Sequence, residues 1–402
     1  MLDAILAINA GSSSIKFALY ALENSGSELR MLYRGNVDGI GAQASFRVIQ
    51  AGDAIQTDMS GQNVDVATHS EALRVILDWM DSQAEQWRIR AVGHRVVHGG
   101  TAYTRAVPVD QGVLDDLKFI IKLAPLHQPH ALQALEILMK QWPHTPHVAC
   151  FDTMFHTSMP PWEIHFALPQ EYAQQGIRRY GFHGLSYEYI SSVLPVHLGE
   201  AASGKIVIAH LGHGVSMCAL PQRQSIATTM SFTPLDGLPM GKRSGALDPA
   251  VVLYLLQDGM SSEAISDLLH HQSGLLGMSG ISDDMRTLLS SADPAAADAV
   301  DYFCYRISRE LGSLTAALGG LDAVVFTGGI GEHAASVRAR ICEAAAWLGL
   351  AIDADANQSD ALQINTTNSK VTVWVIPTNE ELMLARHAAD FIAAEAGRHE
   401  KA

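Results

Sequence analysis

The sequence is poor in cysteine, in basic residues and in long apolar runs. Its four cysteines are widely spaced and form no Cys-x-x-Cys pair, which argues against a disulfide framework and a zinc knuckle. The 27 basic residues are outnumbered by 42 acidic ones, and the net charge of −15 disfavours nucleic acid or an anionic membrane as the main partner. No apolar run approaches the ~18 residues of a membrane span, and the first twenty residues lack the pattern of a secretion signal. We therefore expect a cytoplasmic protein of two or three domains.

Two common catalytic motifs are also missing. Residues 237–244 (GLPMGKRS) have one residue too few between the glycines for a P-loop, and Arg243 separates the lysine from the serine. Despite eighteen histidines there is no His-Glu-x-x-His motif. His94 and His98 fall in a strand-like run, where residues four apart are separated by roughly 13 Å, too far to share one metal ion.

What the chain does have is an internal repeat. Residues 5–19 (ILAINAGSSSIKFAL) and 206–220 (IVIAHLGHGVSMCAL) each consist of an apolar run, a tight polar turn and a second apolar-leaning run, with Gly11 and Gly212 in matching places. Each copy is typical of a β-hairpin whose turn exposes backbone N–H groups, and such a turn can bind phosphate. The repeat indicates two similar α/β lobes, with boundaries at 1–150 plus a C-terminal helix at 385–402, and at 151–384.

Start and stop signals place further helices and strands between the hairpins. Thr68 and Glu71 form a capping box ahead of an amphipathic helix, and Asp248 followed by proline begins another. The remaining expected elements are a loose strand-like stretch at 31–58, strands at 91–97, 148–151 and 322–327, and helices at 131–141 and 295–318.

Polar side chains gather on both hairpins and on one later turn. Asn9, Ser12, Ser14 and Lys16 decorate the first hairpin, where hydroxyl, amide and ammonium donors suit phosphate oxygens. The second hairpin offers four residues in the matching place: His210, Gly212, His213 and Gly214. A run of glycines at 328–331 follows a strand and opens a helix, which fits an adenosine slot better than a full dinucleotide-binding domain, because too little chain remains for the latter.

Four further residues stand out as candidates for phosphoryl transfer. Arg95 and Arg243 lie in glycine-bordered loops, and arginine spreads the charge of a transferring phosphoryl group; the alternative for each is a surface salt bridge. Asp152 closes a buried strand, where it can reach a metal or orient a substrate, or else cap a helix. His183 sits beside a glycine in a loop, which favours a working histidine over a core one.

The last helix is predicted to begin with Thr378 as its N-cap. Glu381 then falls at the third helical position and closes a capping box onto the Thr378 N–H. This leaves Glu380 for solvent or Mg²⁺. The alternative is that both acids simply complement the helix dipole.

Taken together, eight segments resemble the acetate kinase family, in order and almost end to end: residues 9–17 (NAGSSSIKF), 93–100 (GHRVVHGG), 124–127 (APLH), 151–153 (FDT), 179–184 (RYGFHG), 210–212 (HLG), 232–238 (FTPLDGL) and 378–381 (TNEE). The resemblance implies two similar lobes of the duplicated ribonuclease H-like fold of actin-like ATPases, with an interlobe active-site cleft. It also implies a cytoplasmic homodimer that reversibly transfers the ATP γ-phosphoryl group to acetate, giving acetyl phosphate and ADP by direct in-line transfer with Mg²⁺, or with Mn²⁺ in its place.

The resemblance also assigns roles by position. Arg95 and Arg243 would clamp the carboxylate and the moving phosphoryl group, His183 would stabilise its equatorial oxygens, and Asp152 and Glu380 would place Mg²⁺, with Asn9 beside them. His127 and His210 match further active-site positions. The acyl pocket would be formed by Val97, Leu126, Phe182 and Pro234. The nucleotide would contact Asp284, Met285, Arg286, Gly329, Ile330, Gly331 and His333, together with the two hairpin turns.

The chain departs from the family pattern at three places, and three alternative functions stay open. His213 and His333 each stand where the family has asparagine, and Gln128 begins an altered segment after His127; these changes bear on nucleotide affinity. A propionate or butyrate kinase of the same family is one alternative, because a single methylene changes binding by only about 1–3 kcal/mol. An actin-like or chaperone ATPase and a metal-dependent hydrolase are the others.

Overall fold

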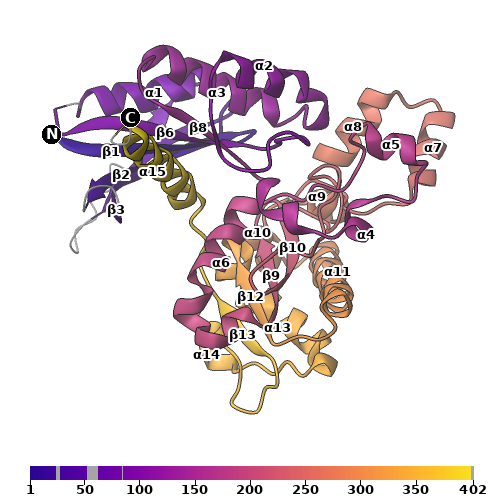
Figure 1. The fold of residues 1–402 in the computed structure, drawn as a ribbon. Helices are drawn as coiled ribbons and strands as arrows, with labels where there is room; N and C mark the ends of the chain where they lie inside the picture. The colour runs from indigo at the N-terminus through magenta and orange to yellow at the C-terminus, as the bar shows by residue number, and fades with distance from the viewer. Residues whose placement is uncertain (24–27, 52–61, 84, 400–402) are drawn as a thin grey trace. The chain divides into compact units, whose positions relative to one another are not determined.

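The computed structural model describes residues 1–402 except 24–27, 52–61, 84 and 400–402. The chain divides into two compact units (Figure 1): unit 1 comprises Met1–Met154 and Asn379–Ala402, and unit 2 comprises Phe155–Thr378. The first division lies close to the expected boundary after residue 150. At the second, the chain rejoins unit 1 at Asn379 and not at residue 385. Among the described residues, no helix is both long and apolar enough to cross a membrane.

Unit 1 is built on an eight-stranded sheet of order β5-β4-β3-β2-β1-β6-β8-β7. The central strand β1 pairs antiparallel with β2 and parallel with β6, and β6 pairs parallel with β8. The strands are β1 Leu2–Ala10, β2 Ser14–Glu23, β3 Glu28–Asp38, β4 Ala44–Gln50, β5 Gln62–Val64, β6 Trp87–Val96, β7 Val107–Pro108 and β8 His147–Phe151. Of the stretch expected at 31–58, residues 52–58 lie outside the described residues; the rest contains most of β3 and all of β4.

Helices cover both faces of this sheet (Figure 1): α1 His69–Asp81, α2 Gln111–Phe119 and α3 Gln128–Gln141 lie on one, and α15 Glu380–His399 lies on the other. Alternate residues of β1, namely Ala4, Leu6 and Ile8, join the core under α1. The capping box predicted at the start of α1 is confirmed, with Thr68 and Glu71 bonded reciprocally. On the other face Gly93 admits α15, because a Cβ there would lie 2.4 Å from the Leu384 carbonyl oxygen.

Unit 2 carries a five-stranded sheet of order β11-β10-β9-β12-β13. The strands are β9 Lys205–Leu211, β10 Val215–Pro221, β11 Ala227–Thr228, β12 Ala323–Thr327 and β13 Thr372–Val375. Figure 1 shows two long helices flanking it, α6 Gly184–Leu198 and α11 Pro294–Leu318. The other α-helices of this unit are α4 Pro161–Ile164, α5 Gln170–Gln174, α7 Pro249–Gln257, α8 Ser262–His271, α9 Gly274–Ser279, α10 Met285–Ser290, α12 Gly328–His333, α13 Ala335–Ala344 and α14 Ala354–Gln358.

The five central strands of unit 1 and the five strands of unit 2 have the same order and directions. In unit 1, β1 pairs antiparallel with β2, β2 antiparallel with β3, β1 parallel with β6, and β6 parallel with β8. In unit 2 the corresponding strands β9, β10, β11, β12 and β13 pair in the same way. This is the ribonuclease H-like arrangement, so the α/β fold and its duplication are confirmed. The two hairpins differ by one residue in their turns: Ala10 pairs with Ile15, whereas Leu211 pairs with Val215. Beyond the turn, Ile15 therefore matches Val215 and not Ser216.

Candidate active site

The first polar turn of unit 1 joins β1 to β2. It is closed by a hydrogen bond of 2.8 Å from the Gly11 N–H to the Ser14 carbonyl oxygen. Ser12 is exposed and Ser14 half-buried, and Lys16 lies opposite Asn9 in the hairpin register. Amide, hydroxyl and ammonium groups therefore gather at this end of the sheet, as the sequence predicts, in a combination that suits phosphate oxygens.

A chain of hydrogen bonds links four of the candidate residues in unit 1. Arg95, near the end of β6, donates from Nε and Nη2 to the two carboxylate oxygens of Asp152, which follows β8, over 2.8 and 2.6 Å. Arg95 Nη1 also donates to the Asn9 side-chain oxygen at 3.0 Å. Asn9 Nδ2 in turn donates to a carboxylate oxygen of Glu380 at 3.1 Å. Parallel strands end at the same edge of the sheet, which is how residues 9, 95 and 152 come together.

Burial and charge oppose each other in the Arg95–Asp152 pair. Asp152 is buried, which raises the pKa of its carboxyl group, while Arg95 acts to lower that pKa. Burial alone would lower the pKa of Arg95, but the carboxylate of Asp152 outweighs this effect and raises it. The guanidinium is therefore held as a cation. Because its fork faces Asp152, two of its five N–H groups remain beyond the three used by Asp152 and Asn9.

The start of α15 differs from the prediction. Asn379 is the capping residue: its side-chain oxygen accepts a hydrogen bond of 3.0 Å from the Leu382 N–H. The Thr378 N–H instead donates to Glu332 at 3.2 Å, so the capping box predicted between Thr378 and Glu381 is wrong. Asparagine is as good an N-cap as threonine, and its use shifts the helix by one residue. Glu380 and Glu381 are then the first two helical residues, where carboxylates complement the helix dipole.

The Glu381 side chain therefore does not accept the Thr378 N–H as a capping box requires. Burial raises the pKa of its carboxyl group and the neighbouring charge of Glu380 adds to this, while Lys16 and Arg95 act in the opposite direction. Both acidic residues thus lie within electrostatic reach of Arg95. The sequence identified the pair but assigned the wrong structural task to its second member.

In unit 2, His183 contacts His210, which the sequence predicts in the site, and Ser216, which it does not. Its backbone is left-handed, with a φ of 56°, directly before α6. Its Nδ1 lies 2.8 Å from the Ser216 hydroxyl oxygen, which also contacts the Tyr187 hydroxyl. The ring stacks on His210 at 4.3 Å between centroids, and His210 Nδ1 lies 2.8 Å from the hydroxyl of Ser186. Ser216 pairs with His210 across the second hairpin, so the register of that hairpin is the signal that could have found it.

The second polar turn lies next to His183. The Gly212 N–H donates to the Gly214 carbonyl oxygen at 3.1 Å. A Cβ on Gly214 would lie 3.0 Å from His183 Nε2, so the imidazole edge abuts the turn. His213, exposed at the tip, contacts Asp283 at 3.0 Å. Although burial would raise the pKa of Asp283, the His213 hydrogen bond and the charge of Lys242 hold it below its usual value.

The residues expected around adenosine fall into two groups. Gly329 is exposed and Ile330 and Gly331 follow it in α12, at the end of β12. His333 is exposed, with its ring nitrogens 4.0 Å from Glu332 and 3.9 Å from Asp360. In the other group Asp284 caps α10 and pairs with exposed Arg286, whereas Met285 is buried.

The four expected acyl-pocket residues are divided between the units, Val97 and Leu126 in unit 1 and Phe182 and Pro234 in unit 2. Val97 and Phe182 are buried, and the Pro234 carbonyl oxygen accepts a hydrogen bond of 3.0 Å from Arg243.

His127 is half-buried just before α3. The next residue, Gln128, is fully buried. Its side chain bonds both the N–H and the carbonyl oxygen of His98, at 3.1 and 3.0 Å, so this departure from the family pattern fastens a neighbouring loop.

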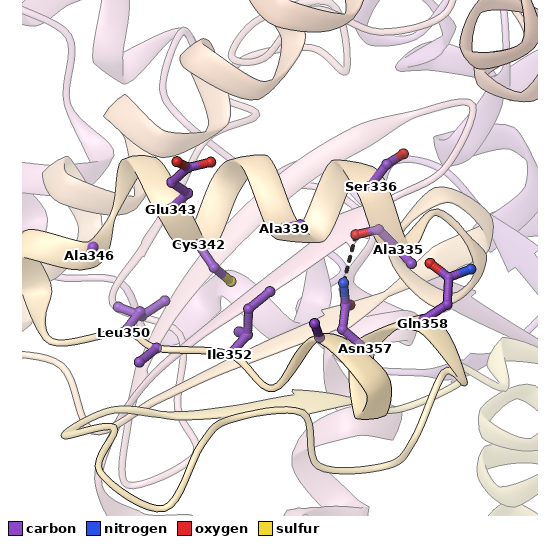
Figure 2. A pocket seen from close by; sticks show the side chains of 12 residues that line it. Ala335, Ser336, Ala339, Cys342, Glu343, Ala346, Leu350, Ile352, Asn357 and Gln358 are labelled. Carbon is purple, nitrogen blue, oxygen red and sulfur yellow. Dashed lines mark hydrogen bonds between the residues drawn. The ribbon is translucent and has the colours of Figure 1, made fainter.

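A pocket of about 570 Å³ lies between α13 and α14 in unit 2. Figure 2 shows Cys342 and Ile352 among its lining residues, and the Asn357 amide donating to the Ala335 carbonyl oxygen at 2.8 Å. None of the residues assigned to the nucleotide lines it. Among the described residues, no group of three or more His, Cys, Asp and Glu side chains is arranged to hold a metal ion.

A repeated α/β unit with a polar turn after the first strand of each copy is the architecture of actin-like phosphotransferases. The chain belongs to the Acetokinase family, whose model matches residues 4–386. It is 52% identical to an acetate kinase of Rhodopseudomonas palustris over 96% of this chain and 98% of that protein, and 48% identical to one of Rhizobium meliloti over 98% and 99%.

Solved structures give the same result. A propionate kinase of Francisella tularensis matches with a TM-score of 0.86 and 36% identity over 97% of this chain and 100% of that one. An acetate kinase of Porphyromonas gingivalis matches with a TM-score of 0.83 and 33% identity over the same shares. The resemblance found in the sequence is therefore confirmed, and the chain is a phosphotransferase that acts on a carboxyl group.

Proposed function

We propose that this protein transfers the γ-phosphoryl group of ATP to acetate, reversibly and by direct in-line attack, giving acetyl phosphate and ADP. The observation that carries the proposal is the bonded series Asp152–Arg95–Asn9–Glu380 at one sheet edge, in a chain of the Acetokinase family. A carboxylate nucleophile is already ionised at neutral pH, so the reaction needs no general base. Positioning and charge stabilisation carry most of the catalysis in such a transfer.

Each candidate residue takes a role that fits its contacts. The remaining N–H groups of Arg95 and the guanidinium of Arg243 bind the carboxylate and the moving phosphoryl group. His183, whose Nδ1 faces Ser216, presents Nε2 to the phosphoryl oxygens beside Gly214. The first turn, with Ser12, Ser14 and Lys16, and the second, with Gly212 to Gly214, contact phosphates; His210 and His127 support them. Gly329, Ile330, Gly331 and His333, with Asp284 to Arg286, bind adenosine.

The acidic residues of unit 1 fit a magnesium ion. The site offers hard oxygen donors from the carboxylates of Glu380 and Asp152 and from the side-chain oxygen of Asn9. Mg²⁺ is usually bound by one or two carboxylates together with substrate phosphates. When bound, the ion neutralises the charge on the β- and γ-phosphates. Mn²⁺, with similar ligand preferences, is expected to substitute. The proposed location is the cytoplasm, where ATP is supplied.

The proposal predicts acetyl phosphate formation that depends strictly on the metal. With ATP, acetate and Mg²⁺, hydroxylamine should trap acetyl phosphate as the hydroxamate, and EDTA should abolish the signal until Mg²⁺ is restored. Omitting acetate should stop ADP formation as well. Turnover of ATP that ignores acetate would instead indicate an ATPase, and turnover in EDTA would refute the magnesium role.

Propionate is the second candidate acceptor, because a propionate kinase is among the most similar solved structures. One methylene in an apolar pocket changes binding by about 1–3 kcal/mol, so both acids can be substrates with different kcat/KM. The same hydroxamate assay with acetate, propionate and butyrate in turn ranks them.

We further propose that the protein is a homodimer that uses α7. This helix is well capped by Asp248, yet none of its residues is buried: Leu253 is 58% and Tyr254 64% exposed. An exposed apolar helix of this kind is a candidate contact surface, and we assign a second copy of the chain to it because the family resemblance implies a homodimer.

Leu253→Glu combined with Tyr254→Glu should therefore yield a monomer in light scattering coupled to gel filtration, where the unaltered protein gives a dimer. Val196→Glu, which places a charge on an exposed residue of α6, should stay dimeric. A dimer that persists in the double variant would show that the interface lies elsewhere.

A further inference from the structure

A histidine that the sequence analysis did not consider is bonded to the first polar turn. His69 is the first residue of α1 and is only 8% exposed. Its Nε2 lies 2.7 Å from the Gly11 carbonyl oxygen. Because a carbonyl oxygen only accepts, Nε2 must carry the proton and donate it. The side chain of one helix thus fixes the orientation of one peptide group in the turn.

The orientation of the Gly11–Ser12 peptide decides whether an N–H or a carbonyl oxygen faces the phosphate. In a trans peptide the carbonyl and the next N–H point in opposite directions, so tying the Gly11 oxygen to His69 aims the Ser12 N–H away from α1. Gly11 has no Cβ, and a glycine makes rotation of the following peptide plane cheap. After such a rotation the negative end of the peptide dipole would take the place of the N–H and would repel a phosphate.

The far side of the turn is held by the main chain. The N–H groups of Gly39 and Ile40 both donate to the Ser13 carbonyl oxygen at 3.1 Å. The first turn is therefore fastened on one side by backbone and on the other by the His69 side chain. The side-chain contact is the part that substitution can remove without altering the main chain.

His69 is itself held in place by a second ring. His130, on α3, stacks on it with 4.0 Å between centroids and 19° between planes. Burial lowers the pKa of His130, and the neighbouring His69 lowers it further, which disfavours the charged form of the His130 ring. The pair connects two helices to the turn.

We propose that His69, supported by His130, is a positioning residue that holds the Gly11–Ser12 peptide with its N–H toward the phosphoryl oxygens of the substrate. The proposal rests on the proposed function, since it assumes that this turn binds phosphate. It assigns to α1 and α3 a part in substrate binding, although neither helix carries a residue placed at the phosphates.

The test compares His69→Leu with His69→Gln. Leucine removes the hydrogen bond, and the KM for both ATP and acetyl phosphate should rise about tenfold while the acetate KM stays within twofold. Glutamine places its amide nitrogen near the former Nε2 and should restore most of the affinity. Equilibrium binding of acetyl phosphate, measured by calorimetry, should follow the same order and does not depend on turnover.

Further variants separate positioning from loss of structure. His130→Ala should raise both phosphate KM values two- to threefold and His130→Phe should not, because phenylalanine keeps the stacked ring. His144→Ala, at an exposed histidine before β8, should change nothing. If folded His69→Leu bound acetyl phosphate as tightly as the unaltered protein, the inference would be overturned. If the unaltered protein made no acetyl phosphate, the proposed function would fail instead.

Discussion

Arg95→Lys should lower kcat by about a hundredfold or more and should also destabilise the protein. Lysine keeps the charge but lacks the planar fork, so it cannot hold both oxygens of Asp152 and the Asn9 amide at once. Charge placement on a transferring phosphoryl group is a large catalytic effect. The buried Asp152 carboxylate is also left partly unpaired, which should reduce the free energy of unfolding by roughly 2–4 kcal/mol. Steady-state kinetics and urea denaturation measure the two effects separately.

Arg243→Lys is the matched control. Arg243 Nη1 donates to the Pro234 carbonyl oxygen at 3.0 Å, which is a neutral acceptor, whereas the fork of Arg95 faces the buried carboxylate of Asp152. We expect a loss of kcat of similar size with little change in the denaturation midpoint. An Arg243→Lys variant with nearly unaltered kcat would show that this arginine is structural, and an Arg95→Lys variant of full stability would show that Asp152 does not need the fork.

Much of the fold could be predicted from the internal repeat. Two apolar runs around matching glycines, Gly11 and Gly212, were enough to predict two hairpins, because strand alternation and turn chemistry are local. The pairing of β1 with β6 and of β9 with β12 is not local, and the alternation of strands with helices indicated only that the two units are α/β. The apolar pattern did not reveal that the second turn is one residue shorter than the first. Two apolar runs still look alike when they are aligned one residue out of step, whereas the hydrogen-bond register of the strands changes with every residue.

Contacts between side chains that are distant in the sequence could not be predicted from it. Nothing near Arg95 in the chain says that its fork faces Asp152, and nothing near His183 points to Ser216. Both contacts arise because separate strands end at one sheet edge or face each other in a hairpin. The error at Thr378 has another origin. Thr378 and Asn379 can both cap the helix, and the Thr378 N–H bonds Glu332, which is distant in sequence, while Asn379 caps α15.

That correction changes what is expected of the two acids at the start of α15. Glu380 bonds Asn9 and is thereby joined to Arg95 and Asp152, which suits a carboxylate that helps to hold Mg²⁺. Burial and the neighbouring charge of Glu380 raise the pKa of the Glu381 carboxyl group, whereas Glu380 is the acid whose carboxylate accepts directly from Asn9. We therefore expect Glu380→Gln to lower kcat by about a thousandfold and to raise the Mg²⁺ concentration needed for half-maximal rate.

Glu381→Gln is the matched variant for this comparison. Glu381→Gln removes one carboxylate charge by the same isosteric change, one residue further along α15. We expect it to lower kcat by roughly tenfold with little change in the Mg²⁺ requirement, because Glu380 is the acid bonded to Asn9 and through it to Arg95. Titrating Mg²⁺ at saturating ATP and acetate measures both quantities. Glutamine keeps an oxygen that can accept from Asn9, so a large loss in Glu380→Gln reports the missing charge rather than a broken hydrogen bond. A greater Mg²⁺ requirement in Glu381→Gln than in Glu380→Gln would move the metal ligand to the second acid.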